Sequence, residues 1–104
     1  MAQEQLPDVV ERFMRFVQID SQSDPQNETQ TPSTPSQHKM AAYLGDELRS
    51  LGVRDVQVTE HAYVLGTVPA SAGAEGLPAL GLCSHIDTSF DAPASGVRPH
   101  VVHY

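Results

Sequence analysis

Residues 79–89 read ALGLCSHIDTS, and this stretch indicates both the fold class and a candidate site. Its first part, Ala79–Cys83, has an apolar or glycine residue at every position, which is typical of a strand buried on both faces inside a parallel sheet. Polar residues follow at once, beginning with Ser84 and His85. Because ligands bind at the carboxyl ends of strands in open α/β sheets, a functional site is predicted where this strand ends.

A first amphipathic helix is predicted over residues 6–19. Apolar side chains recur there in steps of three and four, so they share one face. Pro7 suits an early helical position, where its missing N–H has no consequence. We expect Phe13 and Phe16, which lie on that face, to pack in the core.

A second helix is predicted over residues 35–51. Thr34 and Gln37 have the spacing of a capping box at its start, and Gly52 supplies the left-handed residue that commonly follows a helix. Residues 20–36, between the two helices, contain no aliphatic or aromatic side chain. A connection of this length is unusual in a compact domain unless it is functional or mobile.

Two further strands are predicted between the second helix and Ala79. Val56 and Val58 alternate with polar residues, and an apolar run follows over residues 63–68. The prediction is therefore an α/β fold of two helices followed by three strands of a mostly parallel sheet. Two helices and two other strands barely cover a central strand on both faces. We therefore expect residues 1–104 to form the N-terminal, incomplete part of one larger catalytic domain.

Composition excludes several classes of protein. The formal net charge is −7, which disfavours nucleic acid as a partner because phosphate binding needs a basic surface. The apolar runs are too short to span a membrane. A single cysteine excludes an internal disulfide framework and suits a reducing compartment. We therefore expect a cytoplasmic protein.

His85 and Asp87 are the candidate site residues. Positions i and i+2 of a strand face the same side, so the imidazole and the carboxylate can meet. A metal-bound histidine usually donates its second ring N–H to such a carboxylate. The alternative is a surface histidine beside an aspartate that caps the next turn, because His-x-Asp often arises by chance.

One histidine cannot hold a catalytic metal, since zinc sites need about three protein ligands. The remaining candidates are more typical of surface or packed residues than of ligands. The ligand set is therefore incomplete within the chain. These candidates are His38, His61, His100, His103 and Cys83.

Four stretches, in this order and spacing, resemble a known family. They are PSTPSQ (residues 32–37), LRSLG (48–52), YVLGTVPA (63–70) and SHIDTS (84–89). Together they are similar to the two-zinc metallopeptidase family that also contains carboxypeptidases and aminoacylases, and in particular to its tripeptide aminopeptidase branch. Ala62, where relatives often have glycine, and His103, where an amide is common, depart from the pattern of that branch.

The resemblance implies that His85 is a ligand to one of two zinc ions and that Asp87 is a catalytic residue that orients its imidazole. It implies that the other ligands, a Glu general base and a lid domain lie downstream. The implied activity is release of the N-terminal residue from tripeptides by metal-activated water, with a small peptide as the partner. The 104 residues alone should be inactive. A related dipeptidase or deacylase, or a non-catalytic α/β binding module, remains the alternative.

Overall fold

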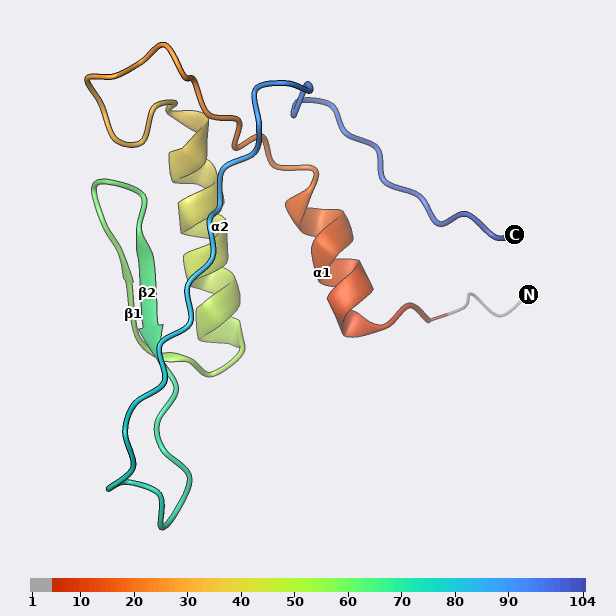
Figure 1. Cartoon of the computed structure of the whole chain (residues 1–104). Helices are drawn as coiled ribbons and strands as arrows, with labels where there is room; N and C mark the ends of the chain where they lie inside the picture. The colour runs from red at the N-terminus through yellow and green to blue at the C-terminus, as the bar shows by residue number, and fades with distance from the viewer. Residues whose placement is uncertain (1–4) are drawn as a thin grey trace.

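A computed structural model describes residues 5–104 of the chain. Its elements are α1 (Asp8–Phe16), α2 (Ser36–Ser50), β1 (Arg54–Val58) and β2 (Val64–Thr67). Figure 1 shows a hairpin of β1 and β2 lying along α2, with α1 on the other side of α2. The fold is thus mixed α/β, as predicted.

Helix α1 is shorter than the predicted range 6–19. Pro7 is its N-cap residue, and the helix passes into a turn at Val17. The prediction that Phe13 packs in the core is wrong, because its side chain is 61% exposed. Phe16 instead packs edge to face on Tyr43 of α2, with ring centroids 5.7 Å apart. Phe16 therefore contacts α2, but α1 has no buried residue.

Helix α2 matches the predicted range 35–51 to within one residue at each end. The predicted capping box does not form, because the N-cap is Pro35 and it makes no side-chain cap hydrogen bond. The Gln37 side chain donates to Thr34 Oγ1 at 3.1 Å instead. Gly52 ends the helix with a φ of 81°, as predicted.

Strands β1 and β2 pair antiparallel, with Gln57 opposite Leu65 and Val58 opposite Val64. The register shifts between Arg54 and Gln57, and Asp55 within this bulge has a φ of 52°. Helix α2 packs closely on the hairpin through a glycine: a Cβ on Gly45 would lie 2.6 Å from Val58 Cγ2.

The predicted third strand at Ala79–Cys83 is absent, and the sheet of the described residues has two strands and no parallel pair. Leu80 and Leu82 are 85% and 88% exposed, so the segment is not buried either. The physical reason is that a strand exists only by hydrogen bonding to a neighbour. Within residues 5–104 the pairing partner of β2 is β1, and no strand lies beside residues 79–83.

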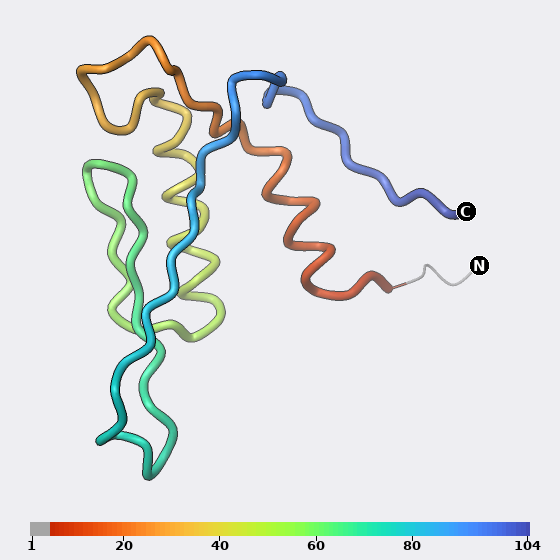
Figure 2. Tube along the Cα trace, in the orientation of Figure 1, coloured from red at the N-terminus to blue at the C-terminus, as the bar shows by residue number. Residues whose placement is uncertain are grey.

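Most of the second half of the chain is irregular. Figure 2 traces it from the end of β2 to a distal loop, back along α2, and past the segment that follows α1. The radius of gyration is 16.9 Å, compared with about 13 Å for a compact chain of this length. Hydrophobic core residues are few in the described part of the chain: Met40, Ala41 and Ala62 are buried.

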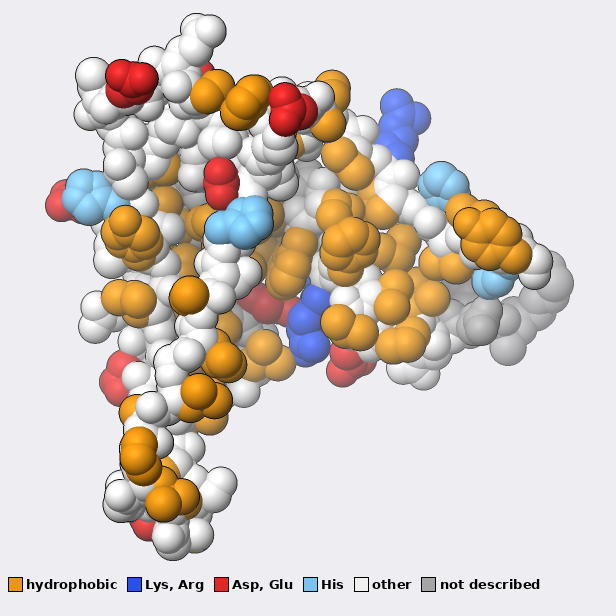
Figure 3. Space-filling model, viewed as in Figure 1, with side chains coloured by type: hydrophobic (Ala, Val, Ile, Leu, Met, Phe, Trp, Pro, Cys, Tyr) orange, Lys and Arg blue, Asp and Glu red, His pale blue; other side chains and the backbone are white. Residues whose placement is uncertain are grey.

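Large apolar side chains are therefore left at the surface. Figure 3 shows hydrophobic side chains along the distal loop and the segment that returns from it. The most exposed of these, at 71–88%, are Val68, Leu77, Leu80 and Leu82. Exposed apolar surface of this kind is typical of a region that contacts further protein.

Candidate functional site

His85 and Asp87 contact each other as their spacing predicts. His85 Nδ1 lies 3.0 Å from Asp87 Oδ1, within hydrogen-bond distance. The imidazole is 82% exposed and the carboxylate 40% exposed. The expected position at the end of a buried strand is wrong, because residues 82–87 are irregular and Asp87 is followed by a single bridge residue, Thr88.

The pair lies at a groove of about 460 Å³. One wall is the segment that carries His85 and Asp87, and the opposite wall is the start of β2 with the residues before it. The volume falls within the range of small-molecule sites. The lining residues are Thr31, Pro32, Gln37, His61, Ala62, Tyr63, Val64, Leu65, Leu82, Cys83, Ser84, His85, Ile86 and Asp87.

The segment that carries His85 and Asp87 ends at Thr88, which is hydrogen-bonded to the loop that follows α1. Gln22 and Thr88 form a parallel bridge. The Thr88 N–H donates to the Ser21 carbonyl at 3.1 Å, and the Ser23 N–H donates to the Thr88 carbonyl at 3.1 Å. The backbone of Thr88, immediately after Asp87, is therefore held on the 21–23 segment through both its N–H and its carbonyl.

The arrangement of His85 and Asp87 suits His85 as a ligand to one metal ion. With Nδ1 turned toward the Asp87 carboxylate, Nε2 is the ring nitrogen that can bind a metal, and in the described part of the chain it makes no hydrogen bond. This is the geometry in which metal-bound histidines are usually found. Within residues 5–104, however, no group of three or more His, Cys, Asp or Glu side chains could hold a metal ion.

The other candidate ligands do not join His85. His61 lines the same groove, but its Nδ1 contacts the Thr31 carbonyl at 3.1 Å and its Nε2 lies 3.6 Å from Glu60 Oε1. Cys83 also lines the groove and is exposed. His38 lines an adjoining hollow beside the loop and not the groove itself, and His100 lies beside α1. His103 lies in the irregular segment at the end of the chain.

Gln37 is a polar residue of this groove that the sequence does not mark as a site residue. Gln37 is 7% exposed, and its side-chain amide donates to Ser33 Oγ at 3.2 Å and to Thr34 Oγ1 at 3.1 Å. The capping-box pattern was a signal that Gln37 contacts Thr34, although the hydrogen bond joins the two side chains and not a side chain and the backbone.

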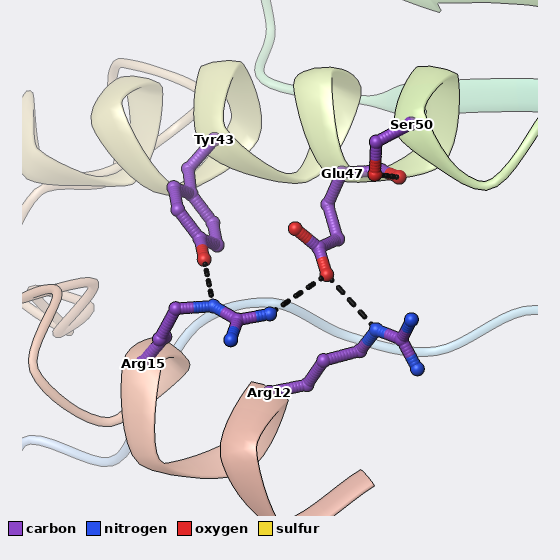
Figure 4. A network of polar contacts seen from close by, with 5 residues as sticks. All are labelled: Arg12, Arg15, Tyr43, Glu47 and Ser50. Atoms are coloured by element: carbon purple, nitrogen blue, oxygen red, sulfur yellow. Dashed lines mark hydrogen bonds and ion pairs between the residues drawn. The ribbon is translucent and has the colours of Figure 1, made fainter. Parts of the chain in front are cut away.

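A second polar network lies away from the groove, between the two helices (Figure 4). Glu47 Oε1 accepts from Arg12 Nε at 2.9 Å and from Arg15 Nη2 at 3.2 Å. Arg15 Nε also donates to the Tyr43 hydroxyl at 2.9 Å. The hydrogen bond to Tyr43, with the nearby Glu47 carboxylate, raises the pKa of Arg15. These contacts join α1 to α2.

No helix in the described part of the chain is long and apolar enough to cross a membrane.

Comparison with known proteins shows which curated proteins the chain is similar to. No protein-family model matches the chain. Peptidase T of Bacillus velezensis is 39% identical over 95 residues, which are 91% of this chain and 23% of that protein. Peptidase T of Shewanella pealeana is 43% identical over 94 residues, 90% of this chain and 22% of that protein. Peptidase T of Clostridium botulinum (strain Langeland) is 36% identical over 97 residues, 93% of this chain and 23% of that protein.

The chain is therefore homologous to a segment of a peptidase. The particular relative is peptidase T in each of these comparisons, and the chain spans 22–23% of the length of these relatives. The resemblance stated from the sequence is confirmed as a similarity to peptidase T.

Proposed function

We propose that this chain is the part of a two-zinc tripeptide aminopeptidase that carries one metal ligand, His85, and the carboxylate that orients it, Asp87. The observation that carries the proposal is the 3.0 Å contact between His85 Nδ1 and Asp87 Oδ1 at an open groove. It is supported by the identity of 36–43% to segments of peptidase T.

His85 would bind zinc through Nε2. The Asp87 carboxylate keeps the proton on Nδ1, which fixes the tautomer and makes Nε2 a stronger ligand. Two zinc ions, when bound, would polarise the scissile carbonyl and lower the pKa of a water molecule. The other ligands and the general base would come from outside residues 5–104, because this part of the chain offers no further cluster.

The groove is large enough for a short peptide. Its volume of about 460 Å³ and its mixed lining, which includes the apolar Val64 and Leu65 as well as His85, suit a small amphiphilic ligand. The formal net charge of −7 disfavours a polyanionic substrate such as nucleic acid. We therefore propose a small peptide as substrate. The likeness to peptidase T is the support for proposing a free amino terminus on that peptide and a cytoplasmic location.

The 104-residue chain by itself should be inactive. A catalytic zinc needs about three protein ligands, and the described residues contain no group of three that could hold a metal ion. Cleavage of a tripeptide by the purified chain, abolished by a chelator, would contradict this expectation. Translation of the gene beyond the codon for Tyr104 should show further Asp, Glu and His residues of a metal site.

The substrate class is tested on the full-length protein loaded with zinc. A tripeptide, the corresponding dipeptide, an N-acetylated tripeptide and an N-acyl amino acid are compared by kcat/KM. The proposal expects the free tripeptide to be the best substrate and the acetylated one to resist cleavage. Preference for the dipeptide or the N-acyl amino acid would assign a sister activity. No cleavage of any of the four, with no zinc bound, would favour a binding module.

A further inference from the structure

A chain of hydrogen bonds connects the first turn of α2 with the backbone after Asp87. Its last link is the bridge between Gln22 and Thr88, in which the 21–23 segment both donates to and accepts from Thr88. Ser23 Oγ adds a third hydrogen bond, to the Thr88 carbonyl at 3.2 Å. The Gln22 side chain donates to the Phe90 carbonyl at 3.3 Å.

The Thr34 hydroxyl is the central link of this chain. It donates to the Gln22 carbonyl at 2.6 Å, the shortest side-chain hydrogen bond in the described part of the protein. It accepts from Gln37 Nε2 at 3.1 Å. Because a hydroxyl has one hydrogen, and Gln22 receives it, Ser36 Oγ is the donor in its 3.2 Å contact with Thr34. All the hydrogen-bonding capacity of this hydroxyl is thus used.

The side chain of Gln37, in the first turn of α2, is the starting point of this series of hydrogen bonds. Its side chain is buried and its amide is shared between Thr34 Oγ1 and Ser33 Oγ. Ser33 Oγ in turn accepts from the Asp24 N–H at 2.9 Å. Gln37 in α2 therefore fastens the loop of residues 20–36 at two points: at Gln22 through Thr34, and at Asp24 through Ser33.

We propose that Thr34 is a positioning residue for the metal site: its hydroxyl holds the 21–23 segment against Thr88 and so keeps Asp87 at the Nδ1 of His85. The inference rests on the proposed function, since it gives the His85–Asp87 pair a metal to bind. It assigns a role to the long polar loop, which would set the orientation of a metal ligand although none of its residues binds the metal.

The test uses the full-length protein and measures zinc affinity by competition with a chromophoric chelator, together with the melting temperature and kcat. Thr34→Val keeps the shape of the side chain and removes the hydroxyl. We expect zinc affinity to fall about tenfold, the lower end of the effect of outer-shell partners. Thr34→Ser retains the hydroxyl and should restore affinity to within about twofold, which is the effect of less than one hydrogen bond.

Thr29→Val is the matched control. It removes the hydroxyl of another threonine in the same loop, one whose Oγ1 contacts Asn27 and does not reach the 21–23 segment. Zinc affinity should be unchanged in this variant. Ser23→Ala is a second test that does not depend on how well Thr34→Val folds, because it removes one exposed hydrogen bond to the Thr88 carbonyl. It should weaken zinc binding by about two- to tenfold.

The outcomes separate this inference from the proposed function. If the unchanged protein binds zinc and His85→Ala reduces the binding, but Thr34→Val and Ser23→Ala bind zinc normally, the positioning role is wrong and the proposed function stands. A lower melting temperature of Thr34→Val with unchanged zinc affinity would make Thr34 merely structural and would also overturn the inference. If His85→Ala does not affect zinc binding, the proposed function itself fails.

Discussion

Glu47 Oε1 in α2 accepts a hydrogen bond from Arg12 Nε in α1 at 2.9 Å, across 35 residues of sequence. The same oxygen accepts from Arg15, and the Glu47 side chain is 17% exposed. Since α1 has no buried residue, these ion pairs and the contact of Phe16 with Tyr43 hold it on α2.

Glu47→Gln should therefore loosen α1. The substitution removes the negative charge that both arginines share, and a loss of about 1 kcal/mol is expected for partly exposed pairs. Amide hydrogen exchange in α1 should become faster, while exchange in α2 stays the same. Asp46→Asn is the control, because Asp46 is 81% exposed and pairs with Arg49 within α2. Equal exchange of α1 in both variants would show that Glu47 does not hold the helix.

Gly45→Ala should destabilise the contact of α2 with the hairpin. The added Cβ would lie 2.6 Å from Val58 Cγ2, so the Val58 side chain or the packing of α2 on β1 must shift. Such overpacking costs about 1–3 kcal/mol, more than the gain of about 1 kcal/mol in helix propensity. Urea unfolding followed by circular dichroism measures the difference. Val58→Ala in the same chain should recover stability, and Gly76→Ala, where nothing lies within 4 Å, should be neutral.

Asp55→Val should also be destabilising. Asp55 has a φ of 52°, a left-handed conformation that aspartate and asparagine tolerate and that β-branched residues avoid. We expect a loss of about 1–2 kcal/mol in the free energy of unfolding. Asp55→Asn should be neutral under the same conditions. Equal stability of the two variants would place this residue outside the left-handed region.

Helix positions could be predicted from the sequence, because they depend on local contacts. The pairing of strands could not be predicted, because it depends on contacts between distant residues. The period of the apolar residues and Gly52 placed α2 to within a residue, since helices depend on hydrogen bonds between near neighbours. The prediction of a strand at Ala79–Cys83 is wrong. Apolar composition indicates only that a segment favours burial, whereas a strand forms only by hydrogen bonding to an adjacent strand. The bulge at Asp55 was missed because the alternation of Val56 and Val58 does not reveal a register shift.

The same division applies to the site. The contact between His85 and Asp87 follows from their spacing, which is local. The hydrogen bonds of Gln22 with Thr88 and of Thr34 with Gln22 join distant parts of the chain, and no periodicity reports them. Gln37 was recognised as a partner of Thr34, but its burial and its position at the groove depend on tertiary packing.

Asp87→Asn should weaken metal binding without abolishing it. The amide keeps the size of the side chain but loses the charge that favours a proton on His85 Nδ1. In the full-length protein we expect zinc affinity to fall about 10- to 100-fold, with full occupancy restored at high zinc concentration. Chelator competition measures the affinity. Unchanged affinity would mean that Asp87 does not orient a metal ligand.

The most direct test of the account is the zinc content of the full-length protein with His85→Ala, measured by elemental analysis after dialysis. His38→Ala is the matched control, since His38 lies at a different hollow beside the loop. His85→Ala should lose one zinc equivalent per chain and most of the peptidase activity, while His38→Ala should keep both. An unchanged zinc content in His85→Ala would contradict it.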